Sequence, residues 1–285
     1  MFYFSNKSII ACMLAGVLVT GCSSEAKNER SIKHYAINDP EKFLMPESLL
    51  EISGITFRPG KSDSIYAIQD EQGRVFRLAW GVKKQYNAKF GKQSDYEDVA
   101  VLKDKVVILK SNGTLFYFSL ADAIYEEVDS VKEIKELLPE GEYEGMYGDD
   151  ATGKLYIICK NCKDDDSKTQ VTGYIFQLGD SILPQGSFHV NVEEIKNITG
   201  KVKRGFRPSG LAKNPVTGEW FMISAVNKLL VVADENWKIK ETCFLNSNIF
   251  NQPEGIAFDE KGNLYISNEG DDFSQGNILK FVRSK

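Results

Sequence analysis

The sequence predicts an all-β protein built from repeats, and three observations support this prediction. The chain of 285 residues contains 17 Phe and 12 Tyr but only 8 Pro, a balance that favours strands. Short apolar runs alternate with turn residues, and Asn112-Gly113 between two such runs is a strong hairpin signal. A short pattern also recurs along the chain. The composition, 42% apolar and 26% charged, excludes a disordered or polytopic membrane protein.

The recurring pattern consists of Glu or Ser, then Gly or Asp, then an apolar residue, and we call each copy an anchor. The five anchors centre on Ser53, Glu97, Glu144, Ser209 and Glu254. They lie roughly 45 residues apart, with one longer interval between the third and the fourth, and a β-propeller blade of four antiparallel strands has this period. Five anchors therefore predict a five-bladed β-propeller.

Each anchor is followed by the same succession of strands. After the fifth anchor we expect strands at residues 256–259, 264–268 and 277–282. The second and third strands of the earlier repeats are expected at 65–68 and 74–78, 106–109 and 114–118, 154–158 and 173–176, and 219–223 and 229–232. Weaker fourth strands are expected at 84–90, from 126 onward, at 187–190 and at 237–244.

The fifth repeat lacks a fourth strand because the chain ends shortly after residue 282. We expect residues 31–37 to supply the outer strand of this last blade, which would remove an exposed edge and tie the two ends of the domain together. The longer interval holds about 20 extra residues relative to the repeat period. We place them between Asn191 and Arg207 as a short helix. Residues 31–285 then form a single propeller domain closed by an N-terminal outer strand.

The first residues of the chain predict export rather than folding. The apolar run at 9–19 is too short to span a bilayer and suits a signal peptide at 1–21. Val19-Thr20-Gly21-Cys22 resembles a bacterial lipobox, so we expect a lipid on Cys22, followed by a polar tether at 22–30. The alternative is an ordinary secretory signal with an incidental cysteine. The expected location is the cell envelope, by a lipid anchor in the outer membrane, facing the periplasm or the surface.

The anchors and their neighbours together resemble the SdiA-regulated family of bacterial exported proteins. The resemblance covers about residues 47–283 and rests on residues 52–55, 96–99, 143–145, 208–211, 252–257 and 262–269. It implies a five-bladed propeller distantly similar to NHL-repeat proteins, and it implies a bound calcium ion. It implies no established activity.

The innermost strands of a propeller line its axis, so Glu97, Glu144 and Glu254 are expected around one opening of the channel. Two carboxylates about 6 Å apart repel by roughly 3 kcal/mol at an effective dielectric of 20. Either a cation lies among them or some share protons with a raised pKa. Oxygen ligands without His or Cys favour calcium or magnesium over zinc. Alternatively, each anchor side chain accepts backbone hydrogen bonds and caps the loop that enters its blade.

Further candidate ligands follow from the same geometry. Ser53 and Ser209 occupy the remaining two anchor positions. The second strand of a blade runs antiparallel to the first, so its end reaches the same rim. This places Asp70, Asn268 and Glu269 there as second-choice ligands or substrate contacts.

Cys159 and Cys162 lie three residues apart after a strand rather than at the start of a helix. A thioredoxin-like role is therefore not expected, and no second pair of cysteines exists for a four-cysteine zinc site. They form either a local disulfide or two free thiols. Export would place them in an oxidising compartment.

The sequence leaves two functions open. The first is a non-enzymatic, calcium-stabilised module anchored in the envelope, a monomer that binds a small ligand or an envelope protein. The second is a metal-dependent hydrolase of the lactonase or phosphoesterase type, with Asp70 or Glu269 as general base and no other catalytic residue assigned. A formal net charge of −5 argues against nucleic-acid binding, which needs clustered Lys and Arg.

Overall fold

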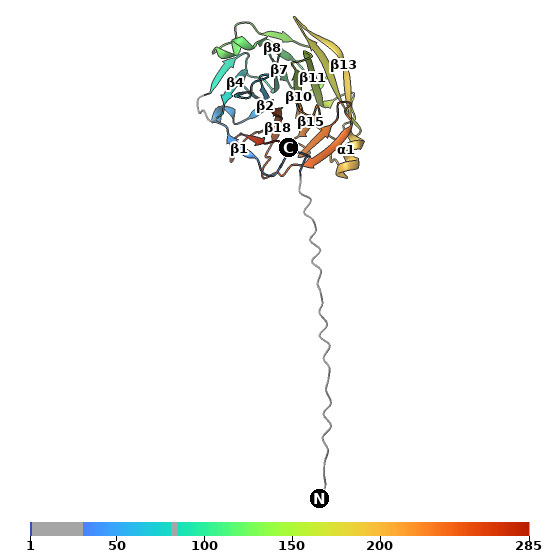
Figure 1. The fold of residues 1–285 in the computed structure, drawn as a ribbon. Helices are drawn as coiled ribbons and strands as arrows, with labels where there is room; N and C mark the ends of the chain where they lie inside the picture. The colour runs from blue at the N-terminus through green and yellow to red at the C-terminus, as the bar shows by residue number, and fades with distance from the viewer. Residues whose placement is uncertain (2–30, 81–84, 285) are drawn as a thin grey trace.

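The protein folds into a five-bladed β-propeller (Figure 1). The computed structural model describes residues 1, 31–80 and 85–284, so most of the expected signal peptide, Cys22 and the tether lie outside the described residues. Each blade is a sheet of four antiparallel strands. Figure 1 shows β2, β10 and β18 near the centre of the ring and β13 at its rim. The sequence prediction of an all-β, five-bladed propeller is confirmed.

In blades one to four the strands follow the chain outward, and in blade five the outermost strand comes from the N-terminal part of the chain. Blade one consists of β2 (Ile52–Phe57), β3 (Ser64–Gln69), β4 (Arg74–Ala79) and β5 (Tyr86–Lys89). Blade two consists of β6 (Tyr96–Leu102), β7 (Lys105–Lys110), β8 (Leu115–Ser119) and β9 (Lys132–Ile134). Blade three consists of β10 (Gly141–Asp149), β11 (Lys154–Cys162), β12 (Gln170–Leu178) and β13 (Ile182–Asn191). Blade four consists of β14 (Gly210–Lys213), β15 (Trp220–Ser224), β16 (Leu229–Ala233) and β17 (Ile239–Phe244). Blade five consists of β18 (Pro253–Phe258), β19 (Leu264–Asn268), β20 (Asn277–Phe281) and β1 (Glu41–Leu44).

An N-terminal strand closes the ring, but it is not the segment that the sequence analysis chose. β1 at Glu41–Leu44 pairs antiparallel with β20, whereas residues 31–37 form no strand in this sheet. Residues 31–37 instead contribute to the apolar core, with Ile32, Tyr35 and Ile37 buried against blades four and five. The alternating apolar residues of this segment look like a strand, but their burial serves packing rather than strand pairing.

Among the described residues, helical structure is confined to short segments. α1 (Val192–Thr199) confirms the helix predicted in the longer interval, and the Asn191 side chain caps it by accepting a hydrogen bond from Glu193 N at 2.9 Å. Two 3₁₀ helices span Glu47–Leu49 and Leu120–Ile124. Within the part of the chain that the structure describes, no helix is both long and apolar enough to cross a membrane.

The apolar core lies between neighbouring blades. The second and third strands of blade four, β15 and β16, are buried along their whole length, because a neighbouring blade covers each face of the sheet. Aromatic rings fill the wider space toward the rim, where Trp220 stacks on Trp237 with ring centroids 4.4 Å apart. This packing fixes the blades and leaves the ends of the central channel as the places where side chains can meet a ligand.

The two ends of the channel differ in the loops that form them. The innermost strands begin at the anchor face, which carries the five anchors and the ends of the second strands. The opposite face carries the loops between the first and second strands, among them Asn214 and Gly262. Tyr35 contacts both of these residues, since its hydroxyl donates to Gly262 O at 2.6 Å and accepts from Asn214 Nδ2 at 2.8 Å. The N-terminal segment therefore enters the domain at the opposite face.

Candidate functional site

The residue after each anchor position lies where two blades approach most closely. A Cβ on Gly54 would lie 2.5 Å from Asp98 Cα in blade two, and one on Gly255 would lie 2.5 Å from Ser53 O in blade one. A Cβ on Gly210 would lie 2.6 Å from Glu254 O in blade five. These positions of the pattern are therefore glycine because the next blade leaves no room for a side chain.

The two anchor serines hold neighbouring blades together. Ser53 Oγ donates to Glu97 O at 2.6 Å, and Ser209 Oγ donates to Pro253 O at 2.7 Å. Both serines are buried, and each of these bonds crosses from one blade to the next. Their hydroxyl protons are thus used in the scaffold, which favours the interpretation of these two anchors as structural.

Asp98 takes the place of the anchor glycine in blade two and forms another link between blades. Its Oδ2 accepts from Met146 N in blade three at 2.6 Å, and its Oδ1 accepts from Val99 N at 2.8 Å. Complete burial raises the pKa of Asp98 well above its ordinary value, although the two backbone donors oppose this. Asp98 is the one Asp at the second position of the recurring pattern, and no role was predicted for it from the sequence.

The three anchor glutamates do not share one environment. Glu144 forms an ion pair with Lys160 of β11, and its carboxylate is nine-tenths buried. Lys160 lies within the short loop that the disulfide between Cys159 and Cys162 closes. The disulfide thereby restricts the backbone that carries the ammonium group. Glu144 is neutralised within the protein, whereas Glu97 and Glu254 are not paired in this way.

Glu97 and Glu254 instead belong to an acidic group with two of the second-choice residues, Asp70 and Glu269. Burial, with the neighbouring carboxylates adding to it, raises the pKa of Glu97 to about 8 and that of Glu269 to about 8. Burial raises the pKa of Glu254 to about 7, against the opposing effect of Lys160. Burial and then the charge of Glu51 raise the pKa of Asp70 to about 6. Such carboxylates need compensation at neutral pH, either by a cation or by shared protons.

Buried oxygen atoms without partners lie at the same end of the channel. Asp70 Oδ1, Glu144 Oε2 and Asn268 Oδ1 are buried and have no hydrogen-bond partner among the described residues. Leaving such an atom unsatisfied costs about 1–3 kcal/mol, so a cation or water is expected to contact it. However, in the part of the chain that the structure describes, no three carboxylate, imidazole or thiolate groups lie close enough together to hold one metal ion. A cation here would need amide, carbonyl or water oxygens besides carboxylates.

A cavity of about 260 Å³ opens at the anchor face between blades three, four and five. Its charged lining consists of two carboxylates and three cations, from Glu144, Glu254, Lys160, Arg207 and Lys228. The cavity therefore combines two of the predicted glutamates with three positive charges, of which Arg207 and Lys228 had been assigned no role from the sequence. Arg207 lies two residues before the fourth anchor, and Lys228 lies in the loop after the second strand of blade four. Their roles were missed because the position of each loop depends on the ring closing.

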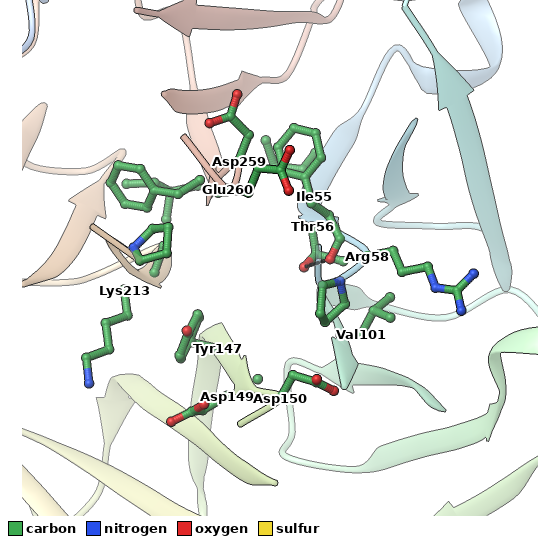
Figure 2. Close-up of a pocket in the computed structure, with 18 of the residues that line it drawn as sticks. Ile55, Thr56, Arg58, Val101, Tyr147, Asp149, Asp150, Lys213, Asp259 and Glu260 are labelled. Carbon is green, nitrogen blue, oxygen red and sulfur yellow. Dashed lines mark hydrogen bonds between the residues drawn. The ribbon is translucent and has the colours of Figure 1, made fainter. Parts of the chain in front are cut away.

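A second cavity, of about 310 Å³, lies at the opposite face and is lined by all five blades (Figure 2). Two of its three cations have partners elsewhere: Arg58 pairs with Asp104 at 3.4 Å, and Lys213 Nζ lies 5.2 Å from the centre of the Trp220 ring. Figure 2 shows Arg58 and Lys213 extending away from the opening. No predicted site residue lines this cavity.

The fold and the anchor-face residues together define a five-bladed propeller whose channel end carries half-buried carboxylates. The chain belongs to the SdiA-regulated family, whose family model matches residues 33–275. The resemblance inferred from the anchors is thus confirmed. No curated protein matches the sequence.

Several solved structures share the fold at low sequence identity. The glutaminyl cyclase of Myxococcus xanthus is 13% identical with a TM-score of 0.54, over 85% of this chain and 96% of that one. The PQQ-bound aldose sugar dehydrogenase of Streptomyces coelicolor is 11% identical with a TM-score of 0.53, over 86% and 99%. A calcium-binding protein, regucalcin, from Agrobacterium tumefaciens is 13% identical with a TM-score of 0.50, over 82% and 92%. These likenesses establish a propeller and no activity.

Proposed function

We propose that this protein is a non-catalytic, calcium-binding propeller that binds a small ligand or a partner at its anchor face. The observation that carries the proposal is the half-buried acidic group of Asp70, Glu97, Glu254 and Glu269, whose pKa values are all raised. Carboxylates held in this way destabilise the folded chain at neutral pH unless a cation compensates them. The alternative of a metal-dependent hydrolase has no specific observation in its favour.

The donor atoms at this face fit calcium better than a transition metal. Calcium takes 6–8 oxygen ligands in flexible geometry and accepts amide and backbone carbonyl oxygens beside carboxylates. Glu97 and Glu254 would hold the ion, and Asn268 Oδ1, which is buried without a partner among the described residues, would complete the set with water. Glu144 contributes less in this proposal because Lys160 already neutralises it.

Calcium titration of the chelator-treated protein tests the proposal. Isothermal titration should show one calcium site in the wild type and at least tenfold weaker binding in the double variant Glu97→Gln/Glu254→Gln. The double variant Glu126→Gln/Glu235→Gln removes the same charge at exposed positions and should bind calcium as the wild type does. Equal calcium affinity in all three proteins, or no binding by the wild type, would contradict the proposal.

We also propose that Cys22 carries the lipid that anchors the protein in the cell envelope. The chain enters the propeller at the opposite face. A lipid on Cys22 would therefore hold the opposite face toward the membrane and the anchor face away from it. The nine residues from 22 to 30 span at most roughly 30 Å when extended. Cells grown with an alkyne-labelled fatty acid should label the wild type and not Cys22→Ser, while Cys243→Ser should label normally. Labelling of Cys22→Ser would refute the proposal that Cys22 carries the lipid.

A further inference from the structure

The guanidinium group of Arg207 lies at the anchor-face cavity without an acidic partner. The backbone of Arg207 is fixed, since its N–H donates to Asn227 Oδ1 at 3.1 Å and its carbonyl accepts from the Ser224 hydroxyl. Its Nε is buried and has no hydrogen-bond partner among the described residues. None of the carboxylates of these residues forms an ion pair with Arg207. A buried, unpaired charged donor is costly, so this group is suited to an anion from outside the chain.

Lys228 adds a second positive group to the same cavity. Its ammonium donates to Asn251 O, and because an ammonium carries three donors, two remain for a ligand. Lys160, by contrast, is already paired with Glu144. Arg207 and Lys228 are therefore the two cations of the cavity that remain able to contact an anion.

The charges around the cavity indicate which anion fits. Three cations face two carboxylates, which leaves a single formal positive charge for the ligand to neutralise. A phosphate dianion would exceed this charge and would be repelled by Glu144 and Glu254, whereas a monocarboxylate would match it. The planar fork of a guanidinium also accepts a carboxylate through two parallel hydrogen bonds.

The volume limits the size of the ligand. About 260 Å³ holds roughly nine groups of the size of a water molecule, at about 30 Å³ each. The larger cavity at the opposite face is less suited to an anion, because four carboxylates line it against three cations, and two of these cations, Arg58 and Lys213, have other partners. The anchor-face cavity is thus fitted to a small organic acid.

We propose that the anchor-face cavity binds the carboxylate group of a small organic monoacid, with Arg207 and Lys228 as the groups that contact it. The inference rests on the proposed ligand-binding role and names the class of ligand for that role. Neither Arg207 nor Lys228 is a candidate metal ligand, but Glu254, which lines the same cavity, is one, so acid binding is tested both with calcium and without it.

Acetate, lactate and benzoate serve as probes, with benzamide as the neutral match of benzoate. Ligand-observed NMR titrations, with calcium and again with a chelator, should show binding of at least one acid, and benzoate should bind at least tenfold more tightly than benzamide. Arg207→Gln should weaken acid binding about tenfold, the loss expected for one charge-assisted contact. Lys228→Gln should weaken it several-fold and serves if Arg207→Gln does not fold.

Arg58→Gln provides the control, since it makes the same change at the opposite cavity and should leave acid binding unchanged. No binding of any acid, equal binding of benzoate and benzamide, or a loss in Arg58→Gln but not in Arg207→Gln would overturn the inference. Tighter binding of inorganic phosphate at the same site would overturn the choice of a monocarboxylate. Acid binding without any calcium binding would refute the calcium proposal alone.

Discussion

Replacing Gly54 by Ala is expected to destabilise the propeller strongly, by about 3 kcal/mol, the upper part of the range for overpacking. The added Cβ would lie 2.3 Å from Asp98 Oδ1, 2.5 Å from Asp98 Cα and 2.8 Å from Val99 N. Two of these atoms are backbone, so the contact can be relieved only by moving blade two away from blade one. The same movement would disturb the bond from Asp98 Oδ2 to Met146 N, 2.6 Å long, and so reach blade three.

Thermal unfolding measures this effect. For a domain of this size, about 3 kcal/mol corresponds to a melting temperature roughly 10 °C lower. Gly179→Ala is the matched control because the nearest atom to its added Cβ would lie 3.8 Å away, and it should melt within about 1 °C of the wild type. Indistinguishable melting of Gly54→Ala and Gly179→Ala would refute the close approach of blades one and two.

The period of the anchors was sufficient to predict the fold because it reflects a local requirement that repeats in every blade. Each anchor marks the place where one innermost strand meets the next, and Gly54, Gly210 and Gly255 are small for that reason. The short helix before Arg207 could likewise be predicted, since an interval longer than the repeat must contain an additional structural element. Requirements of this kind are visible in a single sequence.

The pairing of side chains across the channel could not be predicted in the same way. Glu144, Glu97 and Glu254 occupy equivalent positions, but only Glu144 lies against Lys160, whose position depends on the disulfide beside it. The closing strand was misplaced for a related reason: the apolar residues at 32–37 have a strand-like pattern, while β1 at Glu41–Leu44 is mostly exposed. Which segment pairs with β20 is decided by the completed ring.

The stability of the calcium-free protein is expected to fall as the pH rises from 5.5 to 8.5. The pKa values of Glu97, Glu254 and Glu269 are raised to about 8, 7 and 8, so in this interval the folded chain holds protons that the unfolded chain has released. Each rise in pH then favours the unfolded state, and the penalty is complete only above the raised values. After allowance for partial solvent exposure, we expect a loss of about 1–2 kcal/mol, or about 5 °C in melting temperature.

Calcium should reverse this dependence because it stabilises the ionised carboxylates and binds only the folded chain. With calcium in excess, the melting temperature should therefore stay level or rise over the same pH interval. Glu97→Gln/Glu254→Gln should show a flatter profile without calcium and no response to it, whereas Glu126→Gln/Glu235→Gln should behave as the wild type does. The pH profile thus tests whether calcium or the protein itself compensates the carboxylates of the channel. A calcium-free wild type that gains stability toward pH 8.5 would mean that the carboxylates are compensated within the protein, and a wild type that loses stability but ignores calcium would mean that another cation or a protonated cluster takes its place.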